Sequence, residues 1–143
     1  MEINKRQTEI TNSFAQFESW EQKYRHLIEL GKALPDYPEV WRDKDHLVKG
    51  CQSQVWLHAE LRSDGLVYYS GDSDALIVKG LVALLIKLYS AASPEDILKT
   101  PPEFIAALDL GSHLSPSRAN GLFAMVKQIR YYAMAYQAAL AQA

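Results

Sequence analysis

Apolar residues recur at helical spacing in the first part of the chain. Phe14 and Phe17 lie on one side of a short helix predicted over residues 8–18. Ser19 followed three positions later by Gln22 is a capping-box pattern, which predicts a second helix to about residue 33. Two prolines then end the helical pattern, and residues 36–46 show no pattern that we can interpret.

The period changes from helical to alternating at residue 55. Apolar residues occupy every second position over 55–61, as expected for a strand with one face on a core. Ser-Asp-Gly at 63–65 is a hairpin-turn signal, and residues 66–71 are predicted to form the returning strand. Residues 46–49 are a candidate for a short third strand.

Helices are predicted to fill the rest of the chain. Asp72-Ser73-Asp74 is interpreted as a turn and N-cap of an apolar helix over 74–90. Ser93-Pro94 and Ser115-Pro116 combine an N-cap serine with a proline at the first helical position, which predicts a short helix from 94 and a long one over 116–141. Another short helix is expected after the two prolines at 101 and 102. The pattern predicts an α+β fold, with helices packed on one face of a small antiparallel sheet.

Composition narrows the class of protein. A chain of 143 residues with 48% hydrophobic and 22% charged residues fits one globular domain, residues 1–143, and excludes wholesale disorder. The formal net charge of −2 gives no electrostatic case for a nucleic-acid or membrane-surface partner. The longest apolar stretch, 75–89, contains Lys79 and Lys87 and is too short to span a bilayer. The N-terminus has no apolar signal segment, so we expect a cytoplasmic location.

The sequence contains no recognisable motif for binding a metal or a nucleotide. It has neither a phosphate-binding loop nor a dinucleotide fingerprint, and its four histidines are scattered. The single cysteine, Cys51, has no second cysteine for a disulfide or a zinc set, and too few thiols are present to build an iron–sulfur cluster. We therefore expect no metal site.

Cys51 is the residue on which chemistry could depend. Gly50 precedes it and polar residues follow it, which places the thiol on a loop before the first strand. A free thiol has a pKa of about 8.5, so nearby N–H groups or a cation would have to favour the thiolate at neutral pH. The residues alone leave two interpretations open: a reactive cysteine, or an inert one that packs as a small apolar side chain.

The start of the last helix is also unusual. Arg118 falls in its first turn, where the helix dipole disfavours a cation, so a carboxylate partner or an anionic site should offset the charge. Structural and functional interpretations of Arg118 both stay open. Gly121 inside the helix costs about 1 kcal/mol relative to alanine, which predicts close packing there.

Four stretches together resemble the SufE family of cysteine-desulfurase sulfur acceptors: residues 20–35, 48–57, 71–85 and 113–130, in the family's order. The resemblance implies a small, mostly antiparallel sheet flanked by helices, similar to U-type iron–sulfur scaffolds. It also implies that Cys51 takes a sulfane sulfur from the active-site persulfide of a pyridoxal-phosphate-dependent cysteine desulfurase, stimulates that enzyme and delivers sulfur to an iron–sulfur scaffold complex.

Further expectations follow from the resemblance. Pyridoxal phosphate belongs to the partner, so this chain should need no cofactor of its own, and it would act as a sulfur-transfer accessory protein, not as a stand-alone enzyme. The oligomeric state is left open, a homodimer included. The loop tip beside Val55 and Trp56 should tuck the sulfur into an apolar pocket between transfers.

Supporting roles are implied for four residues near the cysteine. Gly50 would let the loop swing outward, and Ser53 could hydrogen-bond the thiolate. Asp74 would help to form the wall of the loop, while Arg118 would position or screen the thiolate. Trp56 would serve as core or pocket wall without taking part in the chemistry.

Other functions remain as alternatives. The chain could activate a desulfurase allosterically without carrying sulfur itself, or it could feed a different sulfur-using pathway. A thiol redox sensor would need an external thiol, because the sequence has no resolving cysteine.

Overall fold

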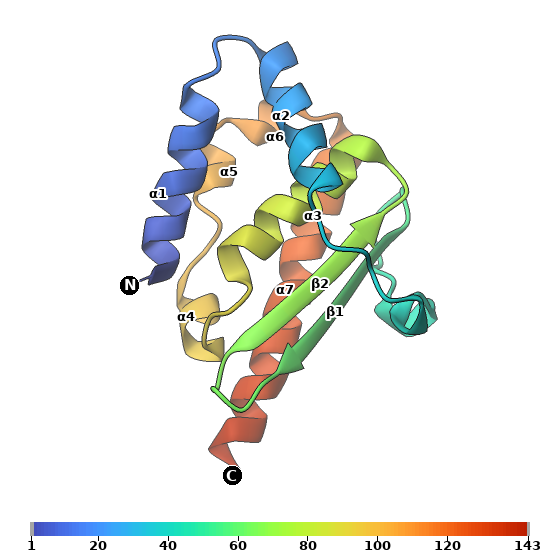
Figure 1. The fold of residues 1–143 in the computed structure, drawn as a ribbon, viewed down its shortest axis with the longest axis vertical. Coiled ribbons are helices and arrows are strands. Elements are labelled where there is room, and N and C mark those ends of the chain that lie inside the picture. Colours follow the sequence, from blue (N-terminus) through green and yellow to red (C-terminus); the bar gives the residue numbers. More distant parts are fainter. Residues whose placement is uncertain (1, 143) are drawn as a thin grey trace.

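A computed structural model describes residues 2–142, and the chain is α+β as the sequence predicts (Figure 1). In chain order its elements are α1 (Glu2–Ala15), α2 (Trp20–Lys32), the short 3-10 helices η1 (Glu39–Trp41) and η2 (Lys44–His46), β1 (Val55–Leu61), β2 (Val67–Ser73), α3 (Leu76–Tyr89), α4 (Pro94–Lys99), α5 (Phe104–Ala107), α6 (Leu110–His113) and α7 (Pro116–Ala141). The β1–β2 hairpin lies against α3 and α7, and α2 packs across α3.

The sheet is a two-stranded antiparallel hairpin. Its register pairs Val55 with Ser73 and Trp56 with Asp72, so β2 continues two residues beyond the predicted end at 71. The predicted third strand is reduced to a single bridge between Leu47 and Trp56, because the chain turns away immediately afterwards. Gly50 has a φ of +95°, a backbone conformation that favours glycine, and it makes this turn.

Helix α3 passes through the core. It lies so close to α2 that a Cβ on Gly80 would stand 2.2 Å from the carbonyl oxygen of Leu27, so the glycine is required by packing. The prediction that residues 72–74 cap this helix is wrong. Ser73 belongs to β2, Ala75 occupies the N-cap position without a side-chain bond, and the helix begins at Leu76.

The helices near the two ends of the chain are fixed by different kinds of contact. The capping box of Ser19 and Gln22 and the N-cap hydroxyl of Ser115 form as predicted. Helix α1, in contrast, begins at Glu2 and not at residue 8. Its buried Gln7 donates to the Pro101 carbonyl at 2.6 Å and accepts from the Phe104 N–H at 3.0 Å, tertiary contacts that local periodicity does not contain.

The side of the hairpin away from α3 is covered by residues 37–46, which we call the strap. The ring of Trp41 stacks on His58 with 3.4 Å between centroids, and the Arg42 guanidinium lies 4.7 Å from the centre of the Trp56 ring. Because Trp56 and His58 alternate with core-facing residues along β1, the strap gives the outer face of this strand a cover of its own. Among the described residues, no helix is long and apolar enough to cross a membrane.

Candidate functional site

The loop that presents Cys51 is closed at both stems. At the first stem, the Val48 N–H donates to the Val55 carbonyl at 2.8 Å. At the second, the Gln54 N–H donates to the Asp74 carboxylate at 3.1 Å, and the Asp74 N–H donates to the Gln54 carbonyl at 3.3 Å. Asp74, expected as a helix cap and, from the resemblance, as loop wall, therefore ties the end of the loop to the end of β2.

Between these stems the thiol rests on the first turns of α7. Cys51 is half-buried, and its Sγ lies 3.5 Å from the carbonyl oxygen of Gly121, to which the thiol donates. A Cβ on Gly121 would stand 3.4 Å from that sulfur, so the close packing predicted at this glycine is found. The absence of a side chain at 121 lets the loop lie directly on the helix.

A pocket of about 20 Å³ lies beside Cys51, which forms part of its wall. Its lining residues come from the loop, α3 and α7: Cys51, Gln52, Ser53, Val78, Ser117, Arg118 and Gly121. Ser53 and Arg118 thus lie beside the cysteine, as the resemblance implied. The predicted wall of Val55 and Trp56 is wrong, because neither residue lines the pocket. Trp56 faces the strap instead.

Electrostatics keep the resting sulfur neutral. Burial raises the pKa of the Cys51 thiol, and a protonated thiol is what donation to the Gly121 carbonyl requires. The nearby cation, Arg118, is exposed and lies on the rim. Within residues 2–142 no carboxylate stands within ion-pair distance of its guanidinium.

Comparison with known proteins identifies the family of the chain. The family model for the SufE Fe-S metabolism associated domain matches residues 8–133, which include the whole loop and its seat on α7. The chain belongs to the SufE family. Its structure is also similar to one described as the solution structure of a hypothetical protein from Thermus thermophilus, with a TM-score of 0.77 and 23% sequence identity over 93% of this chain and 96% of that one. That likeness concerns the fold.

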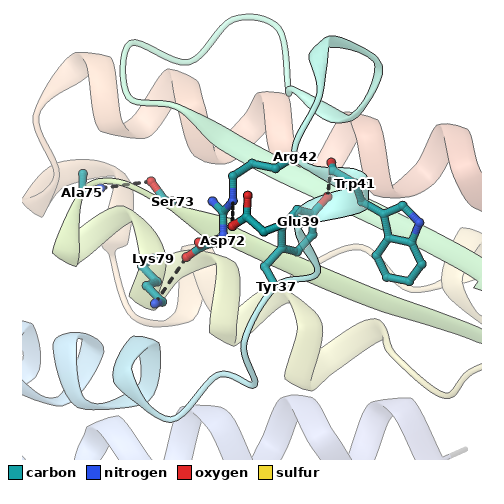
Figure 2. Close-up of polar contacts among 8 residues, drawn as sticks. All are labelled: Tyr37, Glu39, Trp41, Arg42, Asp72, Ser73, Ala75 and Lys79. Atoms are coloured by element: carbon teal, nitrogen blue, oxygen red, sulfur yellow. Dashed lines mark hydrogen bonds and ion pairs between the residues drawn. The ribbon is translucent and has the colours of Figure 1, made fainter.

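This SufE-family protein also contains a cluster centred on Arg42, which sequence reasoning missed (Figure 2). The Arg42 Nη2 lies 2.8 Å from the Asp72 carboxylate, its Nε lies 3.0 Å from Glu39, and its Cζ lies 5.3 Å from the centre of the Tyr37 ring. Lys79 of α3 approaches Asp72 from the other side at 3.3 Å. The cluster therefore joins the strap, the hairpin and α3.

The charge of Asp72 reflects this setting. Partial burial acts to raise the pKa of Asp72, but hydrogen bonds from Arg42 and the Ser73 backbone, together with the charge of Lys79, outweigh it and hold that pKa below its ordinary value. The carboxylate thus stays ionised at neutral pH. Because Asp72 lies two residues before Asp74, the cluster also fixes the strand end that closes the Cys51 loop.

Histidines hold the second half of the strap. The Nδ1 of His46 lies 2.7 Å from the Asp43 carboxylate, and its Nε2 lies 3.0 Å from Nδ1 of His58 on β1. Burial, with a smaller contribution from His46, lowers the pKa of His58. Within residues 2–142 no group of three or more histidine, cysteine or acidic side chains is placed to hold a metal ion.

Proposed function

We propose that Cys51 receives one sulfane sulfur from the active-site persulfide of a pyridoxal-phosphate-dependent cysteine desulfurase and passes it to a scaffold for iron–sulfur cluster assembly. By removing the persulfide, the protein raises the turnover of the desulfurase. Membership of a family associated with Fe-S metabolism supports the pathway. The position of the only thiol supports the residue.

The pocket at the sulfur is the observation that carries the proposal. Its volume of about 20 Å³ is close to the space that one water-sized atom requires. A thiol that only filled the core would need no such space. One further sulfur atom on Cys51 would occupy it, in contact with Val78 and Gly121.

The transfer is a thiol–persulfide exchange. Cys51 loses its proton when the loop leaves its seat and burial no longer disfavours the thiolate. The thiolate attacks the outer sulfur of the partner's persulfide, forming a new S–S bond while the old one breaks, and the partner's cysteine leaves as its thiolate. The product is a persulfide on Cys51, and no oxidant or reductant is consumed.

The surrounding residues have distinct parts in this scheme. Gly50 gives the loop the backbone freedom to swing out. Arg118, an exposed cation at the rim, stabilises the anionic sulfur as it enters or leaves the pocket. Ser53 offers a hydroxyl to the same sulfur, and Asp74 holds the end of the loop in place while the tip moves.

Mass spectrometry tests the proposal directly. After incubation with a cysteine desulfurase and cysteine, the protein should gain the mass of one sulfur atom, which a reductant removes and which Cys51→Ser never acquires. The same variant decides against the allosteric alternative. If Cys51→Ser stimulated the desulfurase as fully as the native chain, the protein would be an activator and not a carrier.

A further inference from the structure

A groove of about 850 Å³ runs beside the Cys51 loop, next to the small sulfur pocket. The strap contributes Lys44 and Asp45 to its wall, and the loop contributes Lys49 and Gly50. Helix α7 contributes its middle turns, through Lys127 and Tyr131 among others. The loop is thus shared between the two hollows.

The groove is basic although the protein as a whole is slightly acidic, with a formal net charge of −2. Three lysines line it together with one carboxylate, that of Asp45. Across residues 2–142, Lys44, Lys49 and Lys127 have no carboxylate within ion-pair distance. Cations gathered in a hollow without partners favour an anionic occupant.

The occupant must also cover exposed apolar surface. Tyr131 is 51% exposed, and Met134, three residues further along the same helix, is 52% exposed. The Lys127 ammonium lies 5.6 Å from the centre of the Tyr131 ring, so charge and aromatic surface adjoin. Aromatic residues and methionine are enriched in protein interfaces, which favours a polypeptide over a small anion.

We infer that this groove docks an acidic, partly apolar segment of the sulfur-donating desulfurase. The inference rests on the proposed function, since it identifies where that partner binds. A segment in the groove contacts Lys49 and Gly50, the two residues directly before Cys51, and so meets the loop at the point from which the thiol must move. The lysines steer the encounter, and the exposed side chains of α7 give the bound segment its apolar contact.

The test compares two charge-reversal variants of the full chain. Lys49→Glu/Lys127→Glu inverts the groove, while Lys44 is left intact because it lies in η2 of the strap. Lys5→Glu/Lys87→Glu makes the same total change of charge on exposed positions of α1 and α3, away from the groove. For each protein, the concentration that gives half-maximal stimulation of the desulfurase is measured.

The groove variant should require about tenfold more protein for half-maximal stimulation, while the control variant matches the native chain. Raising the ionic strength from about 0.01 M to about 0.15 M shortens the Debye length from about 30 Å to about 8 Å, so the native value should move toward that of the groove variant. Lys49→Gln/Lys127→Gln, which only removes charge, should give an intermediate value.

The outcomes separate this inference from the proposed function. At saturating concentration the groove variant should still acquire sulfur from the desulfurase on Cys51, and a melting temperature equal to that of the native chain shows that it is folded. If the native chain acquires none, the proposed function fails. Equal half-maximal concentrations for all variants at both salt concentrations overturn the groove inference alone. A second outcome also overturns the groove inference: the native chain self-associates in a salt-dependent way, and the groove variant loses this self-association without any change in stimulation. The groove would then bind a second copy of the chain.

Discussion

The seat of Cys51 on Gly121 can be tested with two substitutions of different size. Alanine at 121 would place its Cβ 3.4 Å from the Cys51 sulfur and 3.9 Å from the Cys51 Cβ, both ordinary contact distances. Valine adds two methyl groups beyond that point, where only about 20 Å³ is open. The smaller residue therefore fits with the loop in place, and the larger one does not.

The two substitutions should have opposite effects on stability. Replacing a glycine in a helix interior by alanine gains about 0.8–1 kcal/mol, so Gly121→Ala should raise the melting temperature by roughly 3 °C in a chain of this size. Overpacking costs about 1–3 kcal/mol. In Gly121→Val that cost falls on the seated loop alone. Since roughly 1.4 kcal/mol is a factor of ten, the ratio of seated to released loop should fall by about fivefold to about 140-fold.

The assay is the rate at which a thiol reagent modifies Cys51, measured beside thermal unfolding. Gly121→Ala should react about as slowly as the native chain and melt higher. Gly121→Val should react faster, because the released thiol regains both access and the ordinary pKa that burial withholds. A native labelling rate in Gly121→Val would refute the contact between the loop and α7.

Three further predictions concern stability. Arg42→Ala should lower the free energy of unfolding in urea by about 1–2 kcal/mol, because a partly exposed set of charge-assisted hydrogen bonds and the contact with Trp56 are lost. Gly80→Ala should cost about 3 kcal/mol or more in thermal unfolding, since its Cβ would stand 2.2 Å from the Leu27 carbonyl oxygen. The raised pKa of Cys51 means that its stabilising contribution is complete below the unfolded value of about 8.5 and is lost as the pH rises above it, so the native chain should lose more stability at alkaline pH than Cys51→Ser.

Matched substitutions serve as controls. Arg62→Ala removes an exposed arginine that lies 3.8 Å from the Tyr68 ring and should change stability by less than about 0.5 kcal/mol. Gly111→Ala places a Cβ that meets nothing within 4 Å and should be tolerated. If the control variants lost as much stability as Arg42→Ala and Gly80→Ala, the strap cluster and the α2–α3 contact would contribute no more to stability than ordinary surface positions. A pH profile of Cys51→Ser parallel to the native one would contradict the burial of the thiol.

The structural features that could be predicted well from the sequence depend on local contacts. The caps at Ser19, Ser93 and Ser115 depend on hydrogen bonds within three residues, so each helix start could be read from its own segment. The same holds for the turn at Gly50, whose φ is positive. Together with the family resemblance, this was enough to place the single thiol on a loop before the first strand.

What was missed depends on contacts between distant segments. The wall of the sulfur pocket comes from Val78 and Gly121, which no spacing rule connects with Cys51. Arg42 and Asp72 are thirty positions apart, and the strap has no hydrophobic period of its own. One signal was present: the outward positions of β1 hold Trp56 and His58, large aromatic side chains that an uncovered face would leave in water.

The two tied stems of the Cys51 loop set a limit on how far the sulfur can travel. If the bond between Val48 and Val55 holds, Cys51 lies only three positions along the chain from the fixed backbone of Val48. A fully extended chain spans at most about 3.3–3.6 Å per residue, so the backbone at Cys51 can move no more than roughly 10 Å from its anchor. A donor cysteine buried deeper than this in the desulfurase could not be reached by the loop alone. Either its own segment comes forward, or its entrance is wide enough to admit the strap and the end of the hairpin as well.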